Sequence, residues 1–424
     1  MDFKSQIFAF SALTLLQFHA LAGPVVLNGE MLSGFFGQDI HSIRITRMDG
    51  TSIPFQIDEV TEEGEYVLCE GEDPNCDAGD GTLNQQDEIV FLWDDADTLL
   101  KPSVTLAAAE LVELRANGES RAVIVSIDSA IQKSTFSYIQ YDHATEMLNT
   151  PYFYAQFAQD RFHFNRAGVR DFSNKSHVDL TNELRVKILF RALWGLIPIS
   201  YDEDNIVSLV RRYKTGPVRL IRRGDFHLNL GLGVKGSRAA VDQVCYPQMV
   251  KVPVYVHVPF RFRSFFTQAY IEMTPVMRDE GERFVFSVPG IGFETKFSRS
   301  PIDTLLSVVP DRKLFTVTHG SSGYGWLLQT TMESSLLEGS GFLFRKPSSR
   351  DGGLAESGYR LVVRNVPRGY YHITNWVLFS SGSSESIQAN AGQLSRPVEI
   401  IINGQQYTSK LTDSRRIVSV EVHD

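Results

Sequence analysis

Apolar and polar residues alternate with a period of two along much of the chain, and this pattern predicts β-strands. The clearest example spans residues 183–188, where charged and apolar side chains take turns: Glu183, Arg185 and Lys187 against Leu184, Val186 and Ile188. Similar runs follow at 205–213, 216–223 and 251–266 and again in the last hundred residues. Asn or Asp followed by Gly marks hairpin turns at Asp49-Gly50, Asn117-Gly118 and Asn403-Gly404.

These strands predict an all-β protein with more than one unit. At 424 residues the chain is long enough for two or three domains with cores of their own. We expect an antiparallel β-sandwich N-terminal domain with an acidic loop at residues 23–140 and an aromatic linker or first strand at 141–181. A larger multi-strand β-sandwich domain should occupy 182–424. No long amphipathic helix stands out in the half of the chain that begins near residue 182, and the sequence has no internal repeat at a fixed period.

The first 22 residues have the layout of a secretory signal peptide. Lys4 precedes the apolar run IFAFSALTLL, and Ala20 and Ala22 form an A-x-A cleavage pattern. We therefore expect cleavage after Ala22 and a secreted or periplasmic protein. No later apolar run is long enough for a membrane helix: the nearest, 188–199, is too short and contains Arg191. The mature chain is thus expected to have no transmembrane segment.

Charge is distributed very unevenly. Residues 58–97 contain fifteen Asp or Glu and neither Lys nor Arg. The net charge of the chain is −9 and this acidic segment alone carries −15, so the remaining residues sum to +6. The acidic total and the expected export argue against a nucleic-acid partner.

The acidic segment contains oxygen ligands at spacings that favour calcium, because calcium takes six to eight hard oxygen atoms. The candidate ligands are Asp73, Asn75, Asp77, Asp80, Asn84, Asp87 and Glu88. The two half-motifs do not join in the register of an EF-hand, because Ala78 and Asn84 stand at its sixth and twelfth positions. The alternatives are a solvated acidic loop and a surface that binds a partner.

Three cysteines fit an oxidising compartment. Cys69 and Cys76, with six residues between them, are close enough to form a disulfide. Cys245 would then remain free, although sequence alone also allows it to pair with either of the other two.

A basic strip at residues 211–223 complements the acidic segment: Arg211, Arg212, Lys214, Arg219, Arg222 and Arg223. Arginine binds carboxylate and sulfate groups through two parallel hydrogen bonds, so the strip favours an acidic glycan. His227, His257 and Trp326 are further candidates for ligand binding. The alternatives are outward charges on exposed strands and an intramolecular partner for the acidic segment.

These features give three hypotheses of function. The first is an exported protein that binds an acidic polysaccharide or another envelope component and has a calcium-stabilised loop. The second is a polysaccharide-active enzyme, most simply a uronate lyase with a His or Tyr base beside an arginine. The third is a structural surface subunit in which the acidic segment of one copy meets the basic strip of another. No catalytic residue and no oligomeric state can be assigned from the sequence.

Overall fold

The computed structural model confirms an all-β protein built from antiparallel sheets. It describes residues 23–98, 108–159, 161–171, 176–202, 206–229, 235–258, 261–277, 284–288, 293–296, 302–307, 314–319, 324–346, 354–381, 387, 389 and 398–409. The expected signal peptide, residues 1–22, lies outside them. Short 3₁₀ segments join some strands: η1 (Gly29–Phe35), η2 (Cys76–Ala78), η3 (Trp93–Asp95), η4 (Leu193–Gly195), η5 (Phe262–Ser264) and η7 (Ser334–Leu336).

The N-terminal unit is a sandwich of two sheets, as the alternation predicts. The smaller sheet has the order β1 (Pro24–Asn28), β5 (Glu88–Leu92), β3 (Phe55–Asp58). The larger one has the order β2 (Ile43–Thr46), β8 (Glu119–Ile127), β7 (Ala109–Ala116), β28 (Val398–Ile402), β29 (Gln405–Ser409), with β6 (Asp97–Thr98) also paired to β8. Apolar residues of both sheets, such as Leu27, Phe91, Leu114 and Val125, form one buried core.

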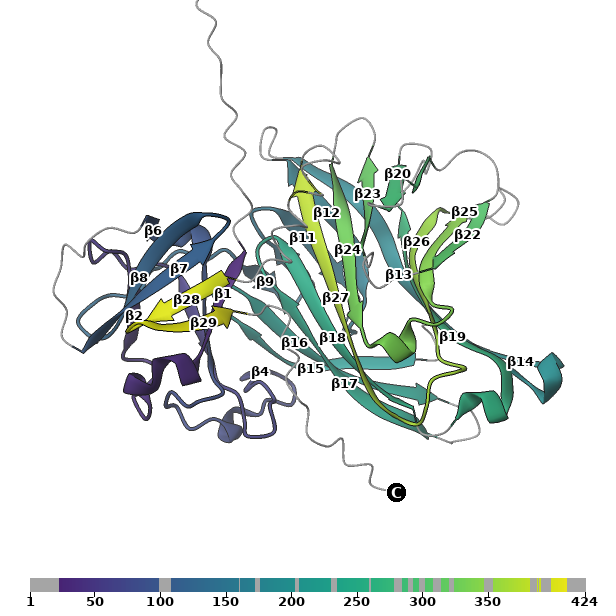
Figure 1. The fold of residues 1–424 in the computed structure, drawn as a ribbon, viewed down its shortest axis with the longest axis horizontal. Coiled ribbons are helices and arrows are strands. Elements are labelled where there is room, and N and C mark those ends of the chain that lie inside the picture. The colour runs from purple at the N-terminus through teal and green to yellow at the C-terminus, as the bar shows by residue number, and fades with distance from the viewer. Residues whose placement is uncertain are drawn as a thin grey trace, which may run out of the picture.

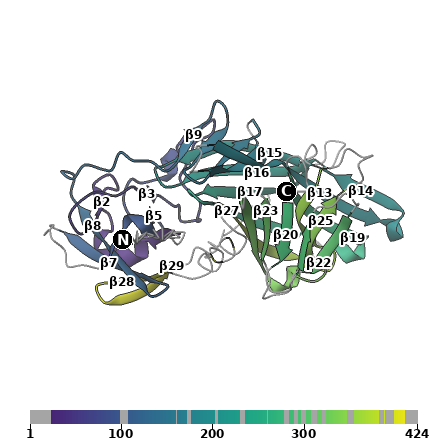
Figure 2. The same cartoon turned by 90° about the horizontal axis from the view of Figure 1, so that it is seen from above.

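The end of the chain returns to this N-terminal unit, which corrects the predicted domain bounds. Strand β28 pairs with β7, for example Ile400 with Leu114, so 398–409 do not belong to the larger unit. Both views show this yellow hairpin beside the blue strand β7, at the edge of the sheet of the N-terminal unit (Figures 1 and 2). The local pattern of the segment predicts its hairpin but not the distant strand with which it pairs.

The larger unit is formed by two ten-stranded sheets. The first, here the front sheet, has the order β22 (Ile302–Ser307), β25 (Gly341–Lys346), β26 (Glu356–Val362), β19 (Phe266–Met277), β13 (Ser176–Ala192), β12 (Phe164–Asp171), β11 (Phe153–Phe157), β10 (Met147–Asn149), β9 (Gln140–Asp142), with β14 (Ile197–Tyr201) also paired to β13. The second, here the back sheet, has the order β21 (Phe293–Lys296), β20 (Phe284–Val288), β23 (Leu314–His319), β24 (Tyr324–Met332), β27 (Gly369–Ser381), β18 (Met249–Val258), β17 (Lys235–Cys245), β16 (Leu220–Asn229), β15 (Ile206–Thr215), β4 (Glu70–Gly71).

The main core fills the space between these two sheets. Phe153 of the front sheet stacks on Phe379 of the back sheet, with ring centroids 4.4 Å apart. Phe315 packs edge-on against both Trp326 and Phe342. Residues 141–181, expected to be a linker or a first strand, contribute β10–β12 and the start of β13 to the front sheet. Of their aromatic residues, Phe153 and Phe157 belong to the main core, and Tyr141 and Phe164 pack against it.

Candidate functional site

The acidic segment and the basic strip lie side by side. Strand β4, inside the acidic segment, forms the edge of the back sheet and pairs with β15, which carries the start of the basic strip. Gly71 makes this close approach possible: its φ is +106°, and a Cβ there would lie 2.3 Å from the carbonyl oxygen of Arg211. The N-terminal unit is thus joined to the larger unit by its most acidic stretch.

Arg219 is the centre of the contact. Its side chain is 1% exposed, and its Nε lies 2.7 Å from Asp58 Oδ2 while its Nη2 lies 2.6 Å from Glu88 Oε2. Lys214 reaches the other oxygen of Asp58 at 2.9 Å. Burial raises the pKa of Asp58, but Arg219 and then Lys214 outweigh it, so the pKa lies below its ordinary value. Asp58 is therefore held ionised inside the protein.

Two more arginines of the basic strip are buried in the same region. Arg222 is 0% exposed; it contacts Glu146 at 2.7 Å and lies 3.7 Å from the ring centroid of Phe157. Arg223 is 2% exposed and pairs with Asp242 at 2.9 Å and Glu65 at 3.0 Å. Both side chains thus form ion pairs with carboxylates of their own chain.

These positions decide between the alternatives for part of the basic strip. Arg219 and Arg223 are intramolecular partners of the acidic segment, and Arg222 pairs with Glu146, which does not belong to that segment. Their prediction as ligand residues needs correcting, because a side chain at most 2% exposed offers no surface to a polysaccharide. Arg211 is exposed and Arg212 is half-buried at the edge of the sheet. His227 lies on β16 and His257 on β18, but their side chains are outside the described part.

The predicted disulfide is confirmed. Cys69 and Cys76 are bonded, with an S–S distance of 2.02 Å, and close a loop within the acidic segment. Cys245 is free and buried in the main core, and burial raises the pKa of its thiol to about 12. A thiol with this pKa stays protonated at neutral pH and has little reactivity.

Most of the predicted calcium ligands stabilise turns of the acidic segment, because their side chains accept hydrogen bonds from backbone N–H groups. Asp87 is fully buried and accepts hydrogen bonds from the backbone N–H groups of Val60 and Asn84, both at 2.8 Å. Asn75 accepts from Leu68 N–H, and Asp80 accepts from Thr82 N–H. Asp73 and Asp77 are exposed beside the disulfide, and Glu88 belongs to the Arg219 contact. Within the described ranges, no group of three or more His, Cys, Asp or Glu side chains is arranged to hold a metal ion.

A hollow of about 600 Å³ lies beside these turns. It is bounded mainly by acidic and amide residues: Glu59, Glu62, Glu63, Asp80, Asn84, Gln85 and Gln86. Burial, together with the nearby charges of Glu59 and Asp80, raises the pKa of Asp87 to about 6, although two backbone hydrogen bonds oppose the rise. The residues that line the hollow include four carboxylates but neither Lys nor Arg, so the hollow carries a net negative charge.

A polar and aromatic patch lies on the face of the back sheet that turns away from the main core. We call Lys251, Tyr255, His372, Thr374 and Trp376 the outer-face patch. The Lys251 ammonium lies 5.1 Å from the centroid of the Trp376 ring, and the rings of Tyr255 and His372 are 4.8 Å apart. His372 Nε2 lies 3.2 Å from Thr374 Oγ1, and its backbone N–H donates to Glu333.

The surroundings of His372 favour the neutral form of its imidazole. Burial and then the charge of Lys251 lower its pKa, and Glu333 opposes them only in part. The patch therefore combines a cation, an uncharged imidazole and a half-buried phenol, which together can donate and accept hydrogen bonds.

Strand register creates this patch. Tyr255 of β18 is paired with His372 of β27, and Lys251 with Trp376, while Tyr370 pairs with the predicted site residue His257. The sequence analysis identified none of the five patch residues. The signal that could have found them is the alternation of polar and aromatic residues on each strand, but the register between two strands more than a hundred residues apart is not visible locally.

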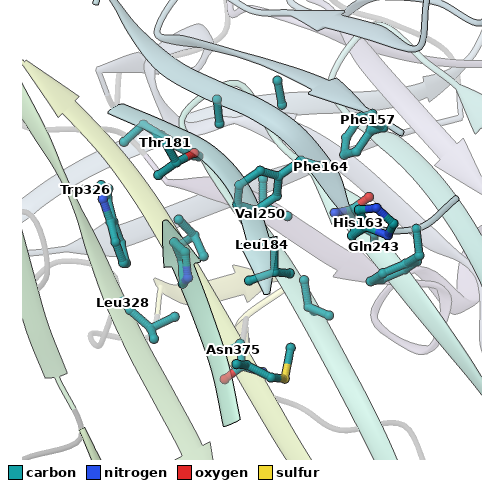
Figure 3. Close-up of a pocket in the computed structure, with 18 of the residues that line it drawn as sticks. Phe157, His163, Phe164, Thr181, Leu184, Gln243, Val250, Trp326, Leu328 and Asn375 are labelled. Atoms are coloured by element: carbon teal, nitrogen blue, oxygen red, sulfur yellow. The ribbon is translucent and has the colours of Figure 1, made fainter. Parts of the chain in front are cut away.

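Trp326, predicted as a ligand residue, lies inside the main core. It is 2% exposed and borders a cavity of about 100 Å³ between the two large sheets, together with Phe157, Phe164, Leu184 and Leu328 (Figure 3). Ligand pockets are usually several hundred Å³, so this cavity is too small for a sugar. Neither Trp326 Nε1 nor Thr181 Oγ1, which also borders the cavity, has a hydrogen-bond partner among the described residues. Trp326 is therefore a packing residue here.

Comparisons with known proteins give no family. No family model matches the chain, and neither does any curated protein. Solved structures with some likeness include an α-mannosidase from Enterococcus faecalis V583 (7% identity, TM-score 0.43, 83% of this chain and 41% of that one). The Slr1438 protein from Synechocystis sp. PCC 6803 (8%, 0.30, 58% and 97%) and heparan sulfate lyase HepC from Pedobacter heparinus (7%, 0.28, 65% and 42%) are others.

The chain thus spans about two fifths of the length of the mannosidase that it partly resembles. All three TM-scores are below 0.5, so these likenesses carry no argument about function.

Proposed function

We propose that this chain is an exported, non-enzymatic protein that binds an acidic polysaccharide or a similar envelope component on the outer-face patch. The observation that carries the proposal is the grouping of Lys251, Tyr255 and His372, all half-buried, on the outer face of the back sheet. Export to the periplasm or the exterior rests on the signal-like first 22 residues.

The chemistry of the patch suits a sugar with a carboxylate or sulfate group. The ammonium of Lys251 supplies the opposite charge, and the ring of Tyr255 offers an apolar face for the C–H side of a sugar ring. Neutral His372 adds a hydrogen-bond donor or acceptor without repelling Lys251. Thr374 and Trp376 of the same patch are buried, and Trp376 belongs to the smaller core that the acidic segment forms with the back sheet.

Removing either polar group of the patch should weaken binding. We expect Lys251→Ala and Tyr255→Ala each to reduce affinity for polygalacturonate or heparin about tenfold, equal to ~1.4 kcal/mol. Affinity electrophoresis in gels containing either polymer measures this, with neutral dextran as the control polymer. The control variant Arg115→Ala removes an exposed cation from the N-terminal unit and should bind normally. Unchanged mobility of the unmodified protein in both acidic gels would rule out the proposed ligand class.

The lyase hypothesis is the second candidate, favoured by one observation: a neutral His372 lies beside Tyr255 and close to the positive charge of Lys251. Elimination from a uronate needs a base next to a cation that neutralises the carboxylate. Arg222, the cation expected from sequence, does not serve because it is buried against Glu146. Incubation with polyuronates would produce a rising ultraviolet absorbance of unsaturated product only if the patch is catalytic.

We also propose that calcium binds in the hollow beside Asp87, where Glu59, Asp80 and Asn84 would supply further oxygen atoms once their side chains move together, since in this structure no group of acidic side chains among the described residues is arranged for a metal ion. The support is the lining of the hollow, which includes the carboxylates of Glu59, Glu62, Glu63 and Asp80 and the amides of Asn84, Gln85 and Gln86. Calcium would then act on the stability of the loop and not on chemistry.

The pH dependence of stability tests the calcium proposal. Because the folded pKa of Asp87 is above its unfolded value, its contribution is complete below pH ~4 and is lost as the pH rises through about 6. In EDTA the unfolding free energy should therefore fall by up to ~3 kcal/mol between pH 4 and 7 relative to Asp87→Asn. Millimolar calcium should remove most of this difference in urea unfolding. An identical pH profile with EDTA and with calcium would contradict the proposal.

A further inference from the structure

A cluster of large apolar side chains is exposed at the far end of the larger unit. Strand β13 ends at Ala192, and the chain turns through η4 into β14, forming a hairpin that projects away from the N-terminal unit (Figure 1). Four residues form what we call the hairpin tip, with these exposed fractions: Trp194 88%, Leu196 80%, Phe265 63% and Ile197 46%.

Strand pairing brings these four residues together from two parts of the chain. Ala192 is paired with Ile197 of β14 on one side and with Phe266 of β19 on the other. Leu196 precedes Ile197, and Phe265 precedes Phe266, so both lie at the same end of the sheet. Below them, Phe190 stacks on Phe262 and contacts Phe266, with centroids 5.5 and 5.0 Å away. The tip thus stands on a rigid aromatic base.

The stability of the folded chain does not explain why a tryptophan occupies position 194. Its φ is +55°, a left-handed conformation that costs free energy for a bulky residue, and its side chain gains almost nothing by packing. An exposed tryptophan in an unfavourable backbone conformation is therefore better explained by a contact outside the molecule.

The charges around the tip indicate what it contacts. Arg191, Arg261 and Arg263 are exposed on its flanks, whereas residues 192–200 and 261–270 contain no Asp or Glu. Tryptophan, phenylalanine and leucine flanked by arginine are typical of segments that insert into the boundary between lipid headgroups and acyl chains. A convex tip of this kind fits a lipid surface, and its positive charge would repel the same tip of a second copy.

We propose that the hairpin tip inserts into a lipid bilayer carrying anionic headgroups, and so holds the protein at a membrane surface. Trp194 and Leu196 enter the apolar boundary, and Arg191, Arg261 and Arg263 contact the anionic headgroups. In the described part of the chain no helix is long and apolar enough to cross a membrane, and this contact does not require one. The proposal is independent of the glycan patch, which lies on different strands.

Tryptophan fluorescence gives a direct test with the whole chain. Of the four tryptophans, Trp93, Trp326 and Trp376 are buried, so Trp194 dominates quenching by aqueous acrylamide. Vesicles of phosphatidylcholine with phosphatidylglycerol should co-sediment with the protein, shift its emission to the blue and protect it from acrylamide, while brominated lipid should quench it. Pure phosphatidylcholine should bind at least about fivefold more weakly, and added salt should reduce binding to the anionic vesicles.

Substitutions separate insertion from folding. Trp194→Gly relieves the left-handed strain, so its thermal unfolding temperature should be equal or higher, while vesicle affinity falls about tenfold or more. Arg261→Gln and Arg263→Gln should each lose about fivefold, and only with anionic vesicles. The control Phe136→Ser removes an exposed aromatic residue elsewhere and should bind normally.

Two results would overturn the proposal. One is failure to bind either vesicle while Trp194 remains open to acrylamide. The other is concentration-dependent association of the protein in the absence of lipid that Trp194→Gly abolishes, which would assign the tip to a contact between copies of the chain.

Discussion

Arg219→Ala should destabilise the protein by about 3–5 kcal/mol, because it leaves the buried carboxylates of Asp58 and Glu88 without their shared cation. Removing one partner of a buried ion pair costs far more than the pair contributes in net terms, since an unpaired charge cannot regain its hydration. Urea unfolding at pH 7 measures the loss. Stability should recover in part near pH 4, where carboxylates become protonated more readily once Arg219 is absent.

Two neighbouring cations provide controls for Arg219. Lys214 also contacts Asp58 but is partly exposed, and Arg219 remains after its removal, so Lys214→Ala should cost only about 1 kcal/mol. Arg211 is exposed at the edge of the sheet, and Arg211→Ala should change stability by no more than ~0.5 kcal/mol. Equal losses for all three variants would mean that burial of the Arg219 contact has no particular energetic importance.

The second large effect is expected at Trp326. Trp326→Ala should cost about 3–5 kcal/mol, because it removes a buried indole that packs edge-on against Phe315 and would enlarge an existing cavity. Trp326→Phe should cost much less, since the indole Nε1 has no hydrogen-bond partner among the described residues and the apolar contacts largely remain. Urea unfolding measures both losses.

The Trp326→Phe variant also tests whether Trp326 has any role in binding. Affinity electrophoresis with polygalacturonate should show normal binding for Trp326→Phe, because the residue lies between the sheets and not on the outer-face patch. Lost binding with unchanged stability would restore Trp326 as a ligand residue and would contradict its assignment to the core.

The buried contact also accounts for how the two units are held together. The smaller core beside it combines Tyr66 and Leu68 of the acidic segment with Ile221 and Trp376 of the back sheet. The Arg219 and Arg223 ion pairs lie next to this apolar contact. Charge pairing therefore specifies which edge of the back sheet the N-terminal unit occupies, while apolar burial supplies the driving force.

Local pattern determined much of the fold. Alternation with a period of two predicts strands directly, because successive side chains of a strand point to opposite faces of a sheet. It thus predicted the all-β class, the N-terminal sandwich and the hairpin at Asn403-Gly404. The Cys69–Cys76 disulfide was also predictable, since six intervening residues keep the two thiols close in any compact loop.

Only the tertiary structure decided which strands meet. Arg219 and Glu88 are 131 residues apart, and Arg222 and Glu146 are 76 apart, so their pairing depends on the order of strands in the sheets. The sequence showed a basic strip and an acidic segment, but alternating charges look the same on an exposed strand and on one buried by another unit. Burial is a property of the assembled layers, and it changed Arg219, Arg222 and Arg223 from ligand candidates into interior ion pairs.

The outer-face patch and the pairing of 398–409 with the N-terminal unit also depend on the order of strands in the sheets. A period of two specifies which residues share a face of one strand, and therefore Tyr255 with Lys251, and His372 with Trp376. It does not specify the neighbouring strand or the register, because backbone hydrogen bonding is nearly the same for every pairing. The sequence by itself therefore determined the strands and their faces, and the packing of distant strands decided the site.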